Sequence, residues 1–134
     1  MSKKITFILK LKFEVYIPEI ESFIKDLSVP YTYGCDEEGT LSFEWFVNPE
    51  GRSAIILEKF SDSTSALVRV NNLITSPVNE PFQELFEIES FLVLGNADEK
   101  LKKELEGWNA SYLPYKDGFE TVSYTHLTLP TKCS

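Results

Sequence analysis

The chain has 134 residues, of which 43% are hydrophobic and 25% charged, so its length and composition fit one globular domain and exclude a wholly disordered chain. Its formal net charge of −8 disfavours nucleic acids and anionic membrane surfaces as partners, because both bind through clustered Lys and Arg side chains. No segment approaches the roughly 20 apolar residues of a membrane span, and we expect no signal peptide, because Met1–Lys4 lead into an alternating segment.

Residues 5–15 carry the clearest strand pattern of the chain, because apolar side chains occupy every second position. These apolar residues are Ile5, Phe7, Leu9, Leu11, Phe13 and Val15. The residues between them are mostly polar, so the strand is expected in a sheet that is covered more heavily on one side.

A helix is predicted after this strand. Pro18 suits a first helical turn, where its missing N–H is not needed. An apolar stripe at helical spacing then runs through residues 20–27. Pro30 is expected to end the helix, and residues 31–40 are expected to form a surface loop, because they contain two glycines and an aspartate.

Two strands joined by a tight turn are predicted next. Residues 41–47 are dense in β-formers, and residues 52–60 return through a second apolar run. The turn at 48–51 has the sequence Asn-Pro-Glu-Gly, so the two strands should form a hairpin.

The second half of the chain predicts two further helices and a strand. Asp62 or Ser63 is expected to cap a helix whose apolar stripe ends at Ile74. A short helical turn can restart at Pro81, and residues 88–94 read as a fourth strand.

A third helix is expected to open at Asn96, which together with Glu99 forms a variant of the capping box. Leu101, Leu105 and Trp108 give this helix its inward side, and Gly107 suits its end.

The predicted order is strand–helix–strand–strand–helix–strand, which is typical of an α+β, ferredoxin-like antiparallel sheet with helices on one face. The strand at 41–47 carries large apolar side chains on both faces, including Phe43 and Trp45 on one and Phe46 on the other. An uncovered patch of such rings is unfavourable. We therefore expect a homodimer that pairs sheet against sheet; the alternative is that the third helix and the tail cover the second face.

Two segments carry a resemblance to a known family. Residues 38–46 (EGTLSFEWF) place a Gly before the second strand and an aromatic–Glu pair within it, and residues 58–63 (EKFSDS) end the third strand before a capped helix. Both resemble the antibiotic biosynthesis monooxygenase-like family of dimeric α+β barrels. Residues 94–96 and 117–119 resemble a subgroup with an added C-terminal helix and a short terminal strand, and the resemblance covers about residues 5–119.

This resemblance implies a domain over residues 1–119, a homodimer and a pocket inside each sheet. Some members of the family oxygenate quinol-like aromatics without metal or flavin, some degrade haem, and many have no assigned activity. The haem-degrading pattern expects a helix His as iron ligand, and this chain has no His before His126. That residue and Cys133 belong to a tail at 120–134, which we expect to lie outside the fold.

Glu44 and Glu58 are the candidate catalytic residues, since they lie on adjacent strands of the predicted hairpin. If their side chains share a face, one carboxyl in an apolar pocket would have a raised pKa and would act as a general base on a phenolic proton. The alternative is that each is solvated at a rim or paired with Arg52, Lys59 or Arg69.

Three residues are candidates for binding a substrate. Trp45 and Phe43 can stack on a planar aromatic ring, and the alternative for Trp45 is a place in the core or a dimer interface. Asn72 can hydrogen-bond a ligand oxygen, and its alternative role, shared by Asn71, is that of a polar group at a helix end.

No metal or cofactor is implied, because the two cysteines, Cys35 and Cys133, and the single histidine form no metal-binding spacing. Two cysteines also give no framework of disulfides, which fits a reducing, cytoplasmic setting. The first functional hypothesis is a cofactor-independent monooxygenase that acts on a small quinol-like or phenolic aromatic. The alternatives are a non-catalytic dimeric ligand-binding or stress-associated protein and a structural dimerisation unit.

Overall fold

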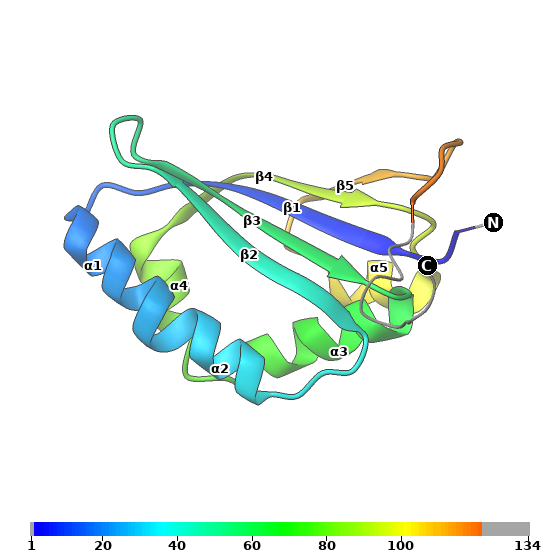
Figure 1. The fold of residues 1–134 in the computed structure, drawn as a ribbon, viewed down its shortest axis with the longest axis horizontal. Helices are drawn as coiled ribbons and strands as arrows, with labels where there is room; N and C mark the ends of the chain where they lie inside the picture. The colour runs from blue at the N-terminus through cyan, green and yellow to red at the C-terminus, as the bar shows by residue number, and fades with distance from the viewer. Residues whose placement is uncertain (1, 122–134) are drawn as a thin grey trace, which may run out of the picture.

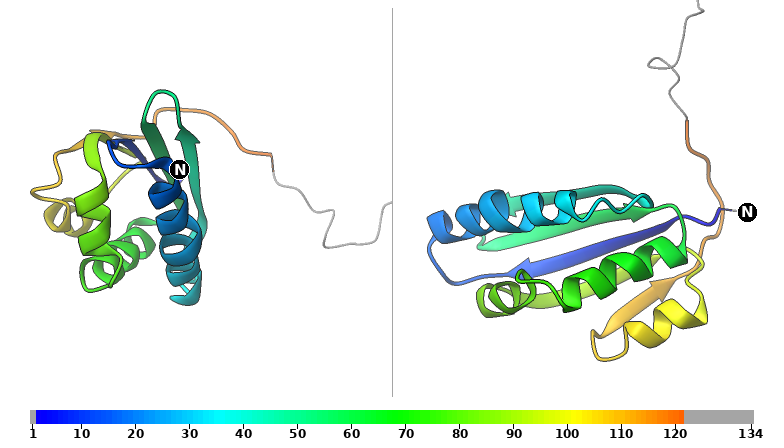
Figure 2. Two further views of the ribbon diagram at one scale, coloured as in Figure 1. Left: turned by 90° about the vertical axis from the view of Figure 1, so that its left-hand side faces the viewer. Right: turned by 90° about the horizontal axis from the view of Figure 1, so that it is seen from below.

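In a computed structural model that describes residues 2–121, five strands form one sheet in the order β2-β3-β1-β4-β5. The strands are β1 (Ile5–Lys12), β2 (Thr40–Asn48), β3 (Ser53–Phe60), β4 (Glu87–Leu94) and β5 (Ala110–Leu113). The strands β2, β3, β1 and β4 are antiparallel to one another in this order, and β5 lies parallel to β4 at the edge. The helices cover one side of the sheet, as Figures 1 and 2 show, so the predicted α+β, ferredoxin-like fold is confirmed.

The alternation read from the first strand sets the core. Ile5, Phe7, Leu9 and Leu11 of β1 are at most 5% exposed and face the helices, where Phe7 packs edge-on against Phe60 and Phe91 of the neighbouring strands. Because β1 is the central strand, this one row of side chains anchors both halves of the core. No helix in residues 2–121 is long and apolar enough to cross a membrane.

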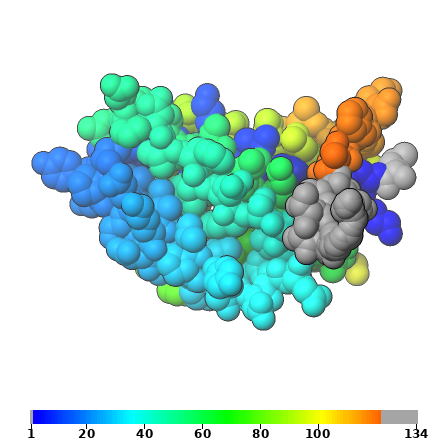
Figure 3. Space-filling model, in the orientation of Figure 1, coloured from blue at the N-terminus to red at the C-terminus, as the bar shows by residue number. Residues whose placement is uncertain are grey.

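The first helical segment is longer than its sequence predicts. It runs through α1 (Ile17–Ser22), the π-helical turn η1 (Phe23–Ser28) and α2 (Val29–Gly34), so the expectation that Pro30 ends the helix was wrong. In the wider π-turn the N–H of Val29 bonds to the carbonyl oxygen of Ile24, five residues back. This widening relieves the clash between a proline ring and the preceding turn, and Pro30 then sits where α2 begins. In Figure 3 this segment, blue to cyan, packs beneath the β2–β3 hairpin.

The hairpin and its turn are as predicted. Asn48 pairs with Ser53, and the side chain of Asn48 accepts a hydrogen bond of 3.1 Å from the N–H of Gly51. Arg52 closes the turn in the left-handed region, at φ 50°. This turn fixes the register of the whole hairpin, so it determines which side chains of β2 and β3 share a face.

The remaining helices are α3 (Ser63–Ile74), α4 (Asn79–Leu85) and α5 (Glu99–Glu104). Asp62 caps α3 as predicted, by accepting a bond of 2.8 Å from the N–H of Ser65. The expected cap of α5 was wrong: Asp98 accepts from the N–H of Leu101 at 2.9 Å, and the side chain of Asn96 instead accepts from the N–H of Tyr115. Asp98 directly precedes the helix and can therefore reach the N–H groups of its first turn, whereas Asn96 lies three residues before the helix begins.

The side of the sheet away from the helices is called the free face. Phe46, Ile55 and Leu113 lie on it and are 52%, 38% and 48% exposed. The added helix α5 does not cover it, because α5 packs beside α3, where the N–H of Asp98 bonds to the Ser63 hydroxyl. Within residues 2–121 the free face therefore stays open (Figure 1). His126 and Cys133 lie outside the described residues.

Candidate active site

A cavity of about 60 Å³ lies between the sheet and the helices that cover it. Most of its lining is apolar or aromatic, and its polar lining consists of Ser28, Thr32, Glu58 and Arg69. Charges in such an interior interact strongly, because the local dielectric constant is low. The two ionisable side chains are therefore the first candidates for chemistry. No group of three or more His, Cys, Asp or Glu side chains in the described part of the chain is arranged to hold a metal ion.

Glu58 lines this cavity from β3. It pairs with Phe43 of β2 and Phe7 of β1, so all three side chains share the side that faces the helices. Glu58 is 7% exposed, and no hydrogen bond or ion pair reaches its carboxyl from residues 2–121. Burial raises the pKa of Glu58 from the ordinary 4.5 to about 7, while the charge of Arg69 lowers this pKa and that of Glu37 raises it. A carboxyl with such a pKa can give or take a proton at neutral pH.

Arg69 approaches the same cavity from α3 and is 4% exposed. Its Nη1 lies 3.6 Å from Oε2 of Glu37, and its Cζ lies 6.0 Å from the centre of the Phe43 ring. The separation from Glu37 makes an ion pair but exceeds hydrogen-bond length, and Nη1 has no hydrogen-bond partner among residues 2–121. A buried donor that the protein leaves unsatisfied favours a ligand that brings an oxygen to it.

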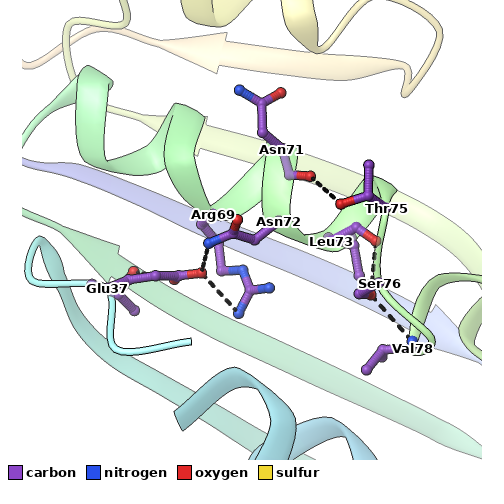
Figure 4. A network of polar contacts seen from close by, with 9 residues as sticks. Glu37, Arg69, Asn71, Asn72, Leu73, Thr75, Ser76 and Val78 are labelled. Carbon is purple, nitrogen blue, oxygen red and sulfur yellow. Dashed lines mark hydrogen bonds and ion pairs between the residues drawn. The ribbon is translucent and has the colours of Figure 1, made fainter. Parts of the chain in front are cut away.

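Glu37 holds Arg69 from the loop between α2 and β2. Its side chain is 3% exposed, and it accepts hydrogen bonds from Oγ1 of Thr40 at 2.8 Å and from Nδ2 of Asn72 at 2.7 Å. Figure 4 shows the Glu37 carboxylate reaching across to both Arg69 and Asn72 of α3. These contacts fix the loop against the helix, and they place a negative charge beside the cavity.

The two predicted stacking residues both line the cavity. Trp45 and Phe43 are half-buried on the side of β2 that faces the helices. The indole N–H of Trp45 donates to the hydroxyl of Ser28 at 3.1 Å, and its ring lies 5.3 Å from that of Phe86. Trp45 is therefore part of the core as well as of the cavity wall, and the hydrogen bond fixes the orientation of its ring.

Glu44 does not join Glu58. In the hairpin register Glu44 pairs with Leu57 while Phe43 pairs with Glu58, so the two carboxyl groups point to opposite faces of the sheet. Glu44 is exposed on the free face. The predicted pair of carboxylates requires both side chains on one face of the sheet. It is not formed, because the hairpin register places Glu44 and Glu58 on opposite faces.

Asn72, the predicted ligand-binding amide, has a protein partner in the structure, since its side-chain N–H donates to Glu37. It does not line the cavity. Its neighbour Asn71 is exposed, and its backbone carbonyl accepts a bond of 3.4 Å from the hydroxyl of Thr75 (Figure 4). Asn72 thus contacts the site through Glu37 and Arg69.

A surface groove adjoins the cavity between α4 and the turn that follows α5. Phe82 and Trp108 line both the cavity and this groove, and Asn79, Gln83 and Glu106 give the groove a polar rim. The two shared rings therefore stand between the interior and the solvent on this side of the molecule.

The pairing of Arg69 with Glu37 is the part of the site that sequence reasoning missed. The sequence suggests Arg69 only as a possible partner of Glu44 or Glu58, and it places Glu37 in the loop predicted at residues 31–40 without a role. One signal was available: Arg69 falls three residues after Ala66 and four before Leu73, within the apolar stripe of its helix. A charged residue at such a position must find a buried partner. The sequence offers no comparable signal for Glu37.

Solved structures share this fold. MupZ from Pseudomonas fluorescens matches with a TM-score of 0.74 at 20% identity, over 90% of this chain and 91% of that one. The protein YJCS matches with a TM-score of 0.53 at 21% identity, over 71% of this chain and 99% of its own. SnoaB from Streptomyces nogalater, a cofactor-independent oxygenase, matches with a TM-score of 0.53 at 12% identity, over 72% and 96% of the two chains.

At these identities the likeness concerns the fold, and it agrees with the fold implied by the resemblance noted in the sequence. No protein-family model matches the chain, and no curated protein sequence matches it.

Proposed function

We propose that this protein is a small enzyme in which Glu58 transfers a proton to or from a largely apolar, oxygen-bearing substrate, while Arg69 binds the substrate oxygen that becomes negative. One observation carries the proposal. The Glu58 carboxyl and the Arg69 Nη1 line the same apolar cavity, and both have hydrogen-bonding capacity that no residue among 2–121 uses.

The chemistry of the two groups is complementary. With a pKa of about 7, Glu58 is present in both protonation states at neutral pH, which suits a general acid–base. A guanidinium in a water-poor cavity stabilises an oxyanion far more than it does in water. Together they favour the removal of an O–H proton and the binding of the anion that results.

The specific reaction that we propose is the oxygenation of a phenol or quinol without a cofactor. Glu58 takes the phenolic proton, and the electron-rich ring carbon of the phenolate reacts with dioxygen to form a C–O bond. Glu58 returns its proton to the outer oxygen of the resulting peroxide. Loss of the proton on that carbon to solvent then forms the second C=O bond, breaks the O–O bond and releases hydroxide, so that overall a phenol and O₂ give a quinone and water. The fold shared with SnoaB supports this form of the proposal.

Entry of an aromatic substrate requires the cavity to open. Its volume of about 60 Å³ has room for a few water molecules, whereas a cavity of about 150 Å³ is known to hold benzene. Phe82 and Trp108 separate the cavity from the outer groove, so rotation of these two rings provides both the entrance and the missing volume.

We propose further that the functional unit is a homodimer joined through the free face. The support is the row of half-exposed apolar side chains that includes Phe46, Ile55 and Leu113, which nothing in residues 2–121 covers. An apolar sheet surface of this kind marks an interface more often than a solvated face.

Oxygen uptake over a panel of phenols and quinols tests the function. The native chain should consume O₂ with at least one substrate class, and Glu58→Gln should lower the rate about 100-fold or more. Glu21→Gln, which removes the same charge from an exposed position of α1 outside both the cavity and the free face, should change the rate less than twofold. An unchanged rate in Glu58→Gln would contradict the proposal.

Two other outcomes assign the cavity differently. Substrate conversion without O₂ uptake would keep the proton-transfer role of Glu58 and reject oxygenation. Saturable binding without conversion of any substrate would identify a non-catalytic ligand-binding protein.

A further inference from the structure

Glu37 is a buried carboxylate that the proposed reaction does not use. Its side chain is 3% exposed, and three groups hold it: the Thr40 hydroxyl, the Asn72 amide and the Arg69 guanidinium. Burying a carboxylate is unfavourable unless it is paired, and removing it from water is costly even then. Glu37 does not line the cavity itself but contacts Arg69, which does, so its charge affects which ligands the cavity binds.

The charges around the cavity are balanced before any ligand enters. Glu37 contributes −1 and Arg69 contributes +1, so the guanidinium offers no net positive charge to a ligand. Glu58 then adds no charge when protonated and −1 when ionised. An anionic ligand would bring the site to a net charge of −1 or −2 in an interior of low dielectric constant.

The ion pair neutralises Arg69 without using its hydrogen bond. Nη1 stands 3.6 Å from the Glu37 oxygen, and it has no hydrogen-bond partner among residues 2–121. The Glu37 carboxylate instead accepts its hydrogen bonds from the Thr40 hydroxyl and the Asn72 amide. The cavity thus presents a free donor at Arg69 without a free positive charge, beside the carboxyl of Glu58.

We infer that Glu37 is a specificity-determining residue, which restricts the cavity to uncharged ligands that bring an oxygen acceptor to Arg69 and an O–H or N–H donor to Glu58. Carboxylates of the same shape are rejected, because they bring in a negative charge while Glu37 already neutralises Arg69, the one cation among the described residues that line the cavity. A substrate that enters uncharged and passes its proton to Glu58 leaves the net charge of the site unchanged. This inference rests on the same cavity as the proposed function, but it concerns binding and not turnover.

Amide–carboxylate pairs of matched shape test it on the full chain at pH 6. Acetamide with acetate and benzamide with benzoate are titrated against the native protein, with calorimetry and with the fluorescence of Trp45 and Trp108, which line the cavity. The amide of each pair should bind about tenfold or more tightly than its carboxylate. Equal or tighter binding of the carboxylates by the native protein, or binding of neither member of any pair, overturns the inference, and this comparison needs no variant.

Glu37→Gln tests the assignment to this side chain. The glutamine keeps the shape and one acceptor of Glu37, and it leaves Arg69 with an uncompensated charge. The preference for the amide should therefore fall by about tenfold or more, or reverse. Glu38→Gln is the matched control, because it removes the same charge from the exposed neighbouring residue, and it should leave the preference within twofold. An unchanged preference in a folded Glu37→Gln protein overturns the role of Glu37.

The two proposals fail separately. If Glu58→Gln keeps full activity, the proposed function is lost while the amide preference stands. If carboxylates bind best, the role of Glu37 is lost while catalysis by Glu58 stands.

Discussion

On the helix side of the sheet Glu58 is 7% exposed and Arg69 is 4% exposed, whereas on the free face Glu44 is exposed to solvent and Lys12 and Glu89 form an ion pair at the surface. The two sides are built from the same strands, and adjacent residues of one strand point to opposite sides. The charged side chains of the two sides therefore differ in their burial. On the helix side the pKa of the Glu58 carboxyl rises to about 7, whereas on the free face Lys12 and Glu89 form a partly exposed ion pair.

The largest expected difference between the two sides concerns their ion pairs. Arg69→Leu leaves Glu37 buried without its cation and should lower the free energy of unfolding by about 3 to 5 kcal/mol. Lys12→Met, which breaks the pair with Glu89 on the free face, should cost less than about 1 kcal/mol. Urea denaturation of the two variants measures both values, and equal losses would contradict the contrast.

The next effect is a pH dependence that Glu58 alone should produce. The folded carboxyl keeps its proton up to about pH 7, while the unfolded chain releases it near 4.5, so folding takes up a proton in between. The stability that comes from this proton is fully present below pH 4.5 and is lost as the pH rises through 7. From pH 5 to 8 the native protein should lose about 2 to 3 kcal/mol relative to Glu58→Gln.

Urea denaturation at several pH values checks this dependence. Glu21→Gln, at an exposed position of α1, serves as the control and should follow the native protein across the range. If the native protein and Glu58→Gln run parallel from pH 5 to 8, Glu58 is not a buried acid.

The smallest expected effect concerns the dissociation of the proposed dimer through the free face. Phe46→Ser removes a ring that is 52% exposed, and burial of that ring in a dimer is worth about 1 kcal/mol for each copy. The dissociation constant of the dimer should rise about 30-fold. The same change at Phe119, which is 92% exposed and lies outside the sheet, should leave it unaltered. Sedimentation equilibrium measures both, and a native chain that is monomeric at all concentrations would reject the dimer.

The fold was largely predictable because its signals are local. The alternation through β1, the turn at Asn48 and the cap at Asp62 each depend on a few neighbouring residues, and each is found as expected. Pro30 was misjudged because the π-turn before it widens the helix, and a pattern of 3.6 residues per turn contains no sign of such a widening.

The site was less predictable, because it depends on register and on contacts between distant segments. Glu44 and Glu58 would share a face if the hairpin were shifted by one residue, and the strand sequences alone do not choose between the two registers. The contact of Glu37 with Arg69 joins a loop to a helix 32 positions further along the chain, and no periodic pattern encodes it.

The titration of Glu58 is the most direct test of its role as a base in the cavity. In a protein labelled with ¹³C at its glutamate carboxyl groups, NMR follows each carboxyl as the pH rises. We predict one glutamate that titrates near pH 7 and whose signal is missing in Glu58→Gln. If every glutamate of the native protein titrates below about pH 5.5, within the usual range of exposed carboxyls, the cavity holds no base of the kind on which the proposed function depends.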